Sequence, residues 1–262
     1  MNNRPEEWQC IACGKMRPCF TVPAPHGARR DEPKYAVLEC RTCGLQGCFP
    51  LPDPEELAEY YTASHDYGRR DMYSGVMGYL RKRLWHRYRN ESIARLIRQF
   101  SPSGRILDYG CGDGHIMRHL AASGLRVVGL EWSEISVTAL RTEGFETIWS
   151  AALDSREAAD GSVACVVASH VVEHLPNPVA FMKSVHKALG ADGALVAALP
   201  SRSSLRARFA GSTWHYVDPP NHLWSFSHEA WRRMTSQGGF DCLELRDSRL
   251  VNEFLSVCRK RP

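Results

Sequence analysis

Four cysteines fall into two pairs of identical spacing. The pairs are Cys10-x-x-Cys13 and Cys40-x-x-Cys43, each followed by a glycine, with 26 residues between them. A Cys-x-x-Cys turn directs two thiolates at one ion, and two such turns supply the four sulfur ligands of a tetrahedral zinc site. Because four protein ligands close the coordination shell, the pattern predicts a structural zinc ion in the N-terminal part of the chain.

Two other interpretations of these thiols remain open at this point. Unrelated or redox-active pairs are one, although a redox Cys-x-x-Cys normally occurs once and near a βαβ unit. Replacement of a ligand by Cys19 or Cys48 is the other, although neither belongs to such a pair. The remaining cysteines lie in apolar or glycine-containing context and are expected to pack as small core hydrophobes; they are Cys111, Cys165, Cys242 and Cys258.

A glycine-rich segment, Asp108-x-Gly110-x-Gly112-x-Gly114, could bind a ligand through its backbone. Residues 105–108 form a short apolar run after a Ser-Pro-Ser-Gly breaker, which predicts a buried parallel strand. Helical apolar spacing follows over residues 115–123, and a second apolar run ends in Glu131. This acid lies 21 residues after the first glycine, where a nucleotide-binding βαβ unit places its ribose partner.

The glycine spacing differs from the dinucleotide fingerprint G-x-G-x-x-G. It resembles motif I of the class I S-adenosylmethionine (SAM)-dependent methyltransferases. SAM has no phosphate, and its amino-acid end can lie against an open glycine turn. An NAD site, or a glycine turn without a ligand, is the alternative. The resemblance implies a set of cofactor-binding residues around the turn, namely Asp108, Gly110, Cys111, Gly112, Gly114, Glu131 and Trp132.

Length and composition set the class of protein. The chain has 262 residues, of which 44% are hydrophobic and 24% charged, as in soluble globular proteins. The net charge of +4 is too small to indicate nucleic acid by itself. No apolar run approaches the roughly 18 residues of a membrane helix, and the N-terminus has no apolar signal region. We therefore expect a cytoplasmic protein that binds no membrane.

Three segments are expected in the chain. A zinc ribbon should occupy residues 1–52, a helical cap or linker residues 53–100, and a SAM-binding domain residues 101–262. Within the cap, Pro54 suits the first turn of a helix that runs to about Tyr61. Residues 73–100 also look helical and contain many arginines, including Arg89. The apolar face of this helix is expected to consist of Leu80, Leu84, Ile93, Leu96 and Ile97. We favour a solvated basic face here over one that binds RNA or an anionic substrate.

The resemblance extends to most of the chain. Cys40-Arg-Thr-Cys-Gly-Leu45, the segment 54–61 and Tyr67 resemble bacterial methyltransferases with an N-terminal zinc ribbon, a tyrosine-bearing cap and a SAM domain. That group includes enzymes similar to sugar C- and O-methyltransferases of polysaccharide and natural-product pathways. It implies an α/β, Rossmann-like, seven-stranded sheet whose last strand is antiparallel. It also implies a cofactor-binding role for Tyr67.

The resemblance also implies a function. Its members would transfer methyl from SAM to an oxygen, nitrogen or carbon atom of a small molecule, such as a sugar or another pathway intermediate. A zinc-ribbon RNA methyltransferase is the first alternative, although nucleic acid is disfavoured. A non-catalytic module that binds SAM and zinc is the second. The sequence leaves open the acceptor and the oligomeric state.

Further site residues are expected at the ends of later strands. The third strand should lie within residues 145–152 and precede Asp154. The resemblance implies an acid near this position that receives the adenine amine, and the N-cap of a helix is the alternative role for Asp154. The fourth should span residues 163–169 and place Ser169 and His170 at the SAM pocket. The following Glu173-His174 pair resembles a family element and is expected to hold loop and helix together. A helix over 179–189, closed by Gly190 and Gly193, and a fifth strand over 194–199 should follow. The resemblance implies that residues 240–246 and 253–258 form a closing antiparallel hairpin.

Residues 201–221 read as an insertion that arches over the cofactor, since open α/β sheets bind ligands beyond the carboxyl ends of their strands. Pro220-Asn-His222-Leu-Trp-Ser-Phe-Ser227 resembles another family element. A neutral histidine suits removal of a proton from a hydroxyl or an acidic carbon. His222 is the first candidate general base and His215 the second. His222 could instead brace the loop through backbone hydrogen bonds.

Overall fold

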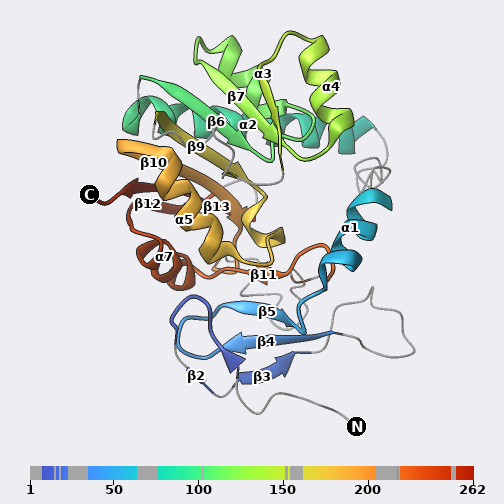
Figure 1. Ribbon diagram of the computed structural model, residues 1–262, viewed down its shortest axis with the longest axis vertical. Helices are drawn as coiled ribbons and strands as arrows, with labels where there is room; N and C mark the ends of the chain where they lie inside the picture. The colour runs from blue at the N-terminus through green and yellow to red at the C-terminus, as the bar shows by residue number, and fades with distance from the viewer. Residues whose placement is uncertain are drawn as a thin grey trace.

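The structure is a computed structural model that describes residues 8–14, 16–17, 19–22, 35–63, 76–101, 103–150, 153, 162–203, 217, 219–248 and 252–262. The larger part of the molecule is a central sheet with helices on both faces, and the N-terminal strands form a smaller sheet beside it (Figure 1). None of the helices in the described ranges has the length and apolar composition needed to span a bilayer.

The central sheet has seven strands in the order β12-β13-β10-β9-β6-β7-β8. The five neighbouring strands β10, β9, β6, β7 and β8 are parallel to one another. Strand β13 runs antiparallel to both of its neighbours, β10 and β12. This confirms the predicted α/β sheet with an antiparallel last strand. The strands are β6 Arg105–Tyr109, β7 Val127–Glu131, β8 Thr147–Trp149, β9 Val163–Ser169, β10 Leu189–Pro200, β12 Phe240–Asp247 and β13 Glu253–Lys260.

Alternate residues of the central strands enter two cores, one on each face of the sheet. On β6, Leu107 and Tyr109 join the core that contains Phe181 and Trp231, from helices α5 (Pro178–Ala188) and α7 (His228–Gln237). Ile106, between them, joins the core formed with helices α2 (Val76–Phe100), α3 (His115–Ala122) and α4 (Glu134–Thr142). Both faces of the sheet are therefore covered, as its nearly continuous apolar strands require.

Helix α2 differs in part from its predicted faces. Ile93, Leu96 and Ile97 are buried as expected, but Leu80 and Leu84 are 45% and 66% exposed. The predicted apolar face is thus wrong at Leu80 and Leu84, because the residues that α2 contributes to the core, such as Ile93 and Ile97, come from its second half. The prediction that the arginines of this helix are solvent-exposed is correct for Arg83, Arg87, Arg95 and Arg98. It is wrong for Arg89, which is 7% exposed.

Strand β10 begins earlier than predicted. It starts at Leu189, directly after helix α5 ends at Ala188, rather than at Ala194. The pairing with β9 shifts register between Leu189 and Ala194, so the two glycines predicted to close the helix lie within an irregular strand. Gly193 is needed there, because a Cβ atom would lie 2.7 Å from the Leu189 Cβ.

The N-terminal part contains two small antiparallel sheets. The strand pair β1 (Trp8–Gln9) and β2 (Met16–Arg17) forms one. The other has the order β11-β5-β4-β3, with β3 Cys19–Val22, β4 Ala36–Cys40 and β5 Gln46–Phe49. Its fourth strand, β11 (Trp224–Ser225), comes from the C-terminal half of the chain and lies between the two parts of the molecule (Figure 1).

Side chains reinforce this junction between the N-terminal strands and the rest of the molecule. The Arg202 guanidinium donates to the Glu39 carboxylate and to the Gly44 carbonyl. The hydroxyl of Ser227 donates to the Cys43 carbonyl, and the amide of Gln237 donates to the backbone of the first cysteine turn. Helix α1 (Pro54–Ala63) follows β5 and leads from the N-terminal strands toward the edge of the central sheet (Figure 1).

Candidate cofactor and metal sites

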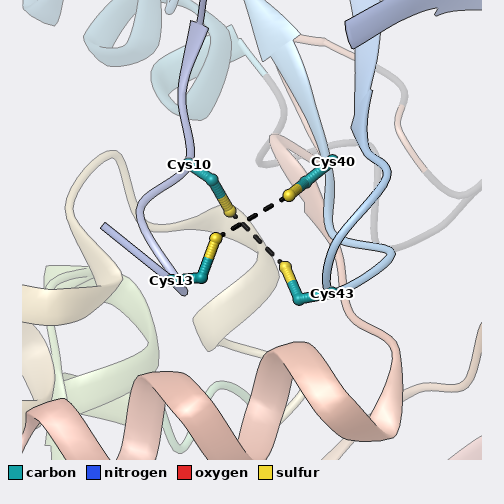
Figure 2. A group of neighbouring side chains, drawn as sticks. All are labelled: Cys10, Cys13, Cys40 and Cys43. Atoms are coloured by element: carbon teal, nitrogen blue, oxygen red, sulfur yellow. Dashed lines mark hydrogen bonds between the residues drawn. The ribbon is translucent and has the colours of Figure 1, made fainter. Parts of the chain in front are cut away.

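The four predicted cysteine ligands converge on one point. Figure 2 shows their sulfur atoms directed toward one another from two separate turns. The Sγ atoms of Cys10 and Cys43 are 3.5 Å apart, those of Cys13 and Cys40 are 3.8 Å apart, and all four lie within 4.8 Å of one another. Zn–S bonds of about 2.3 Å would set tetrahedral sulfurs roughly 3.8 Å apart, whereas a disulfide needs about 2.0 Å. The arrangement therefore fits a four-sulfur ion site.

The backbone of both turns is built alike. In each, the amide after the second cysteine donates to the carbonyl of the first, at 2.8 Å from Gly14 to Cys10 and 2.8 Å from Gly44 to Cys40. Both glycines have positive φ, 62° and 71°, which a side chain would disfavour. A hydrogen bond with the Cys43 thiol and burial both raise the pKa of Cys10, so these surroundings by themselves favour the thiol over the thiolate. A bound cation would reverse that preference.

The glycine turn after β6 has the expected shape. Gly110, Gly112 and Gly114 all adopt positive φ, at 69°, 53° and 78°. A Cβ atom on Gly110 would lie 2.8 Å from a Val171 methyl group, and one on Gly114 would lie 2.3 Å from Leu140. The turn thus keeps its backbone close to its neighbours, and α3 begins directly after it at His115.

The Glu131 carboxylate, at the end of β7, is held by backbone amides. Oε2 accepts from Gly112 N at 2.9 Å, and Oε1 accepts from Trp132 N and Ser133 N at 3.0 and 2.9 Å. Its residue is only 5% exposed. These bonds fix the acid against the glycine turn and leave lone pairs for a hydroxyl donor, since a carboxylate has about four acceptor sites.

A cavity of about 470 Å³ lies at the carboxyl ends of the parallel strands. Of the predicted cofactor residues, Gly110, Glu131, Trp132 and His170 line it. Asp108, Cys111, Gly112, Gly114 and Ser169 are not among the lining residues but lie within four positions of Gly110 or His170 in the chain. The walls also include Ala58 of α1, as well as Tyr109, Ser150 and His174. Its volume lies within the range of about 300–1,000 Å³ that is usual for small-molecule sites.

Asp108 lies beneath the glycine turn and is 2% exposed. Its Oδ2 atom finds no hydrogen-bond donor within the described ranges. Burial and the nearby Glu131 charge raise the pKa of this carboxyl to about 8, although Arg89 pulls in the opposite direction. Asp108 is therefore largely protonated at neutral pH unless a further cation approaches it.

His170 is the centre of a buried ion group. Its Nδ1 lies 3.2 Å from Glu173 Oε1 and its Nε2 lies 2.9 Å from Glu253 Oε2. Both ring nitrogens thus face carboxylates and act as donors, which defines an imidazolium. Burial opposes that charge, but the two acids overcome it and raise the pKa of His170 to about 9. The residue has φ 54°, a costly conformation for a non-glycine residue at a strand end.

Two neighbours of His170 escaped the sequence analysis. Glu253, on β13, is 2% exposed, and its Oε2 lies 3.9 Å from the Arg89 guanidinium. Arg89 also lies over the Trp85 ring at 4.8 Å. The helical spacing could have indicated the burial of Arg89, because this residue lies on the same side of α2 as the buried Asn90 and Ile93. No local pattern marks Glu253, which lies 83 residues from His170.

His222 lies beside the element that follows β9. Its ring is 4.6 Å from the His174 ring and tilted by 65°. His174 Nδ1 donates to the Asn221 carbonyl at 2.9 Å, and the Leu223 amide donates to the Glu173 carbonyl at 2.8 Å. Glu173 and His174 hold this loop in place, as expected, and His174 in addition lines the cavity. Three other candidates, Tyr67, Asp154 and His215, lie outside the described residues.

Comparison with known proteins places the chain in a family. Residues 84–245 match the methyltransferase domain family, and the chain belongs to it. This family match confirms the predicted resemblance to class I SAM-dependent methyltransferases. A curated relative, the ubiquinone biosynthesis O-methyltransferase of Caulobacter sp. (strain K31), is 28% identical over 130 residues, which are 46% of this chain and 52% of the relative. The chain therefore spans about half the length of that protein.

Solved structures show the same fold at low identity. The 1,6-didemethyltoxoflavin-N1-methyltransferase of Burkholderia thailandensis has a TM-score of 0.59 and 14% identity, over 91% of this chain and 100% of its own. The magnesium protoporphyrin IX methyltransferase of Synechocystis PCC 6803 has a TM-score of 0.59 and 16% identity, over 79% and 100%. Both of those proteins bind S-adenosylhomocysteine.

The raised pKa of Asp108 makes a prediction about stability. The folded carboxyl keeps its proton to about pH 8, whereas an unfolded one loses it near pH 3.9. The contribution of the Asp108 carboxyl to the free energy of unfolding is therefore fully present below about pH 4 and is lost as the pH rises to about 8. We expect Asp108→Asn, which cannot ionise, to gain stability relative to wild type as pH rises from 5 to 8. Urea unfolding at several pH values measures this difference.

The matched control is Asp192→Asn, whose carboxyl is exposed on β10. Its stability difference from wild type should stay constant over the same pH range. A constant difference for Asp108→Asn as well would contradict the buried, protonated state.

Proposed function

We propose that the protein is a SAM-dependent methyltransferase that acts on a small molecule. The observation that carries the proposal is the Glu131 carboxylate, held by Gly112 at the rim of a cavity next to the glycine turn. A ribose hydroxyl pair can donate to this acid, and the amino-acid end of SAM can lie against the turn. Membership of the methyltransferase domain family supports this assignment.

The reaction is an in-line displacement at the methyl group of a sulfonium. The acceptor atom forms a bond to the methyl carbon while the carbon–sulfur bond breaks, and the bonding electrons return to sulfur. Because the sulfonium is already a good leaving group, the protein must mainly orient the acceptor and remove its proton. Shielding from water by the cavity walls preserves this geometry.

For the acceptor, we propose the hydroxyl of a biosynthetic intermediate, such as a sugar or an aromatic alcohol. The curated relative is an O-methyltransferase, which supports oxygen, and the small-molecule methyltransferases among the structural neighbours support a compact substrate. The cavity of about 470 Å³ lies within the size range of small-molecule sites. Carbon and nitrogen acceptors remain the alternatives for substrate screens.

We further propose that Cys10, Cys13, Cys40 and Cys43 bind one structural zinc ion. Their convergence and spacing support zinc, and four sulfur ligands leave no position for a substrate. The ion would join the two cysteine turns. These turns carry the contacts from Gln237 and Ser227, so zinc would also secure the N-terminal sheets against the central domain.

Zinc content tests this assignment. Cys13→Ser/Cys43→Ser should lose the one ion per chain, because two remaining thiolates do not complete the shell, and should unfold locally in the N-terminal part. Elemental analysis and limited proteolysis measure the two effects. Cys48→Ser changes a buried cysteine outside the cluster and should keep its zinc. Full zinc in the double variant would disprove the site.

Cofactor binding tests the role of Glu131. Glu131→Ala removes a charged hydrogen-bond acceptor and should weaken the binding free energy of SAM, measured by calorimetry, by about 1–3 kcal/mol. Glu134→Ala, an exposed acid three residues later in the chain, should bind SAM as tightly as wild type. Equal SAM affinity of Glu131→Ala and wild type would remove the acid from the ribose site.

We propose that loss of the acceptor proton depends on His222. Its ring packs on His174, which lines the cavity, and this supports a place close to the acceptor. His222→Ala should keep its SAM affinity and lose about 10²–10⁴-fold in single-turnover rate, the usual scale for one acid–base group. A parallel loss of SAM affinity would instead indicate that His222 only braces the loop.

A further inference from the structure

Three potential metal ligands meet at one edge of the cavity. Glu173 and His174 belong to the short helix η2 (Val172–His174) after β9, and His222 comes from the loop before β11. Each offers one ligand atom, and the three atoms lie within 4.8 Å of one another. Two imidazoles and one carboxylate form a common ligand set for divalent transition metals with open coordination positions.

The Glu173 carboxylate is the observation that points to a ligand. Its residue is 1% exposed, and within the described ranges Oε2 has no hydrogen-bond donor. Oε1 lies 3.2 Å from His170 Nδ1 but, within the same ranges, also accepts no hydrogen bond of good geometry. A buried carboxylate oxygen without a donor is costly, and native structures normally satisfy it through protein, water or an ion. A cation between Glu173 and the two histidines would satisfy it.

The surroundings of His174 prepare it for this role. Its Nδ1 is 2.9 Å from the Asn221 carbonyl, which can only accept a hydrogen bond. Nδ1 therefore carries the hydrogen, and the lone pair lies on Nε2. Metal-bound histidines typically donate their second nitrogen to a backbone carbonyl in this way, which fixes the tautomer and ring orientation. His222 lies in edge-to-face contact with this ring at 4.6 Å.

Other charges nearby leave the position open. His170 Nδ1 lies 3.2 Å from Glu173 Oε1, and Glu253 Oε2 lies 2.9 Å from His170 Nε2 and 3.9 Å from the Arg89 guanidinium. Glu253 therefore has two such neighbours, and one of these, His170, also lies beside Glu173. The second oxygen of Glu173 remains for a ligand on the side of His174 and His222.

We propose that Glu173, His174 and His222 bind a divalent first-row cation at the edge of the methyl-transfer cavity. Three protein ligands leave coordination positions of the cation open for another group. His174 lies next to the proposed cation and also lines the cavity. The role of this cation in the reaction rests on the proposed methyltransferase function, whereas its binding does not.

In that role, the cation binds the acceptor hydroxyl and lowers its pKa, so that the proton passes to water. The oxygen then forms its bond to the methyl carbon of SAM as the carbon–sulfur bond breaks. The products are the methyl ether, S-adenosylhomocysteine and the released proton. The dependence on His222 would then arise from metal binding rather than from proton acceptance by its own ring.

Metal binding is tested with Mn²⁺ on full-length protein that retains its zinc. Electron paramagnetic resonance of free Mn²⁺ should show one bound ion per wild-type chain, with binding weakened at least about 10–100-fold in Glu173→Gln and in His222→Asn. The matched control is His119→Asn, whose imidazole faces Glu91 on the surface at 3.1 Å, and it should bind Mn²⁺ as wild type does. No bound Mn²⁺ in wild type, or unchanged binding in both ligand variants, overturns the proposal.

Cobalt and SAM separate the remaining outcomes. Added Co²⁺ should give weak visible bands typical of nitrogen and oxygen ligands, and an intense thiolate band alone would assign the ion to the cysteine cluster and overturn the proposal. Calorimetry with SAM on the same samples checks that the variants are folded. In the wild-type protein, SAM binding without Mn²⁺ binding rejects the cation site alone, whereas Mn²⁺ binding without SAM binding rejects the methyltransferase function and leaves the site standing.

Discussion

The pairing of β11 with β5 is the interaction on which the candidate active site depends. Trp224 lies opposite Gly47 and Ser225 opposite Gln46, so a two-residue strand from the C-terminal half completes a sheet of the N-terminal part. The Cys48 amide extends the contact by donating to the Leu223 carbonyl at 3.0 Å. His222 immediately precedes this segment, and its position is therefore set by the N-terminal strands as well as by the central sheet.

Charge burial is the second constraint. Glu131, Glu173 and Glu253 are each at most 5% exposed, and Arg89 and His170 supply fewer cationic groups to balance them. Such an excess of acid beside a cavity favours a cationic occupant.

Features encoded locally were predictable from the sequence. The cysteine turns, the glycine turn and Glu131 each depend on residues close together in the chain, and the apolar runs of β6, β7 and β9 set the sheet. The predicted convergence of the cysteine ligands and the predicted buried strands agree with the structure because short-range spacing and strand burial dominate them. The seven-stranded sheet with its antiparallel strand was implied by the family resemblance.

Long-range contacts were beyond the sequence. A two-residue strand such as β11 has no periodicity, and its partner lies more than 170 residues away in the chain. The ion pairs of His170 with Glu253 and of Glu253 with Arg89 likewise join three distant elements. Arg89 looked like one of several solvent-exposed arginines because composition does not reveal which side of a helix meets a buried acid.

Hydrogen–deuterium exchange in residues 219–226 tests the central claim, that the cysteine cluster positions the His222 loop through the β5–β11 pairing. The comparison is between wild type and Cys13→Ser/Cys43→Ser, with β6 and β9 as internal references. Our account predicts faster exchange in 219–226 of the variant, with unchanged protection in β6 and β9, because local opening follows the loss of the pairing strand. Unchanged protection of 219–226 in a variant that has lost its zinc would contradict it.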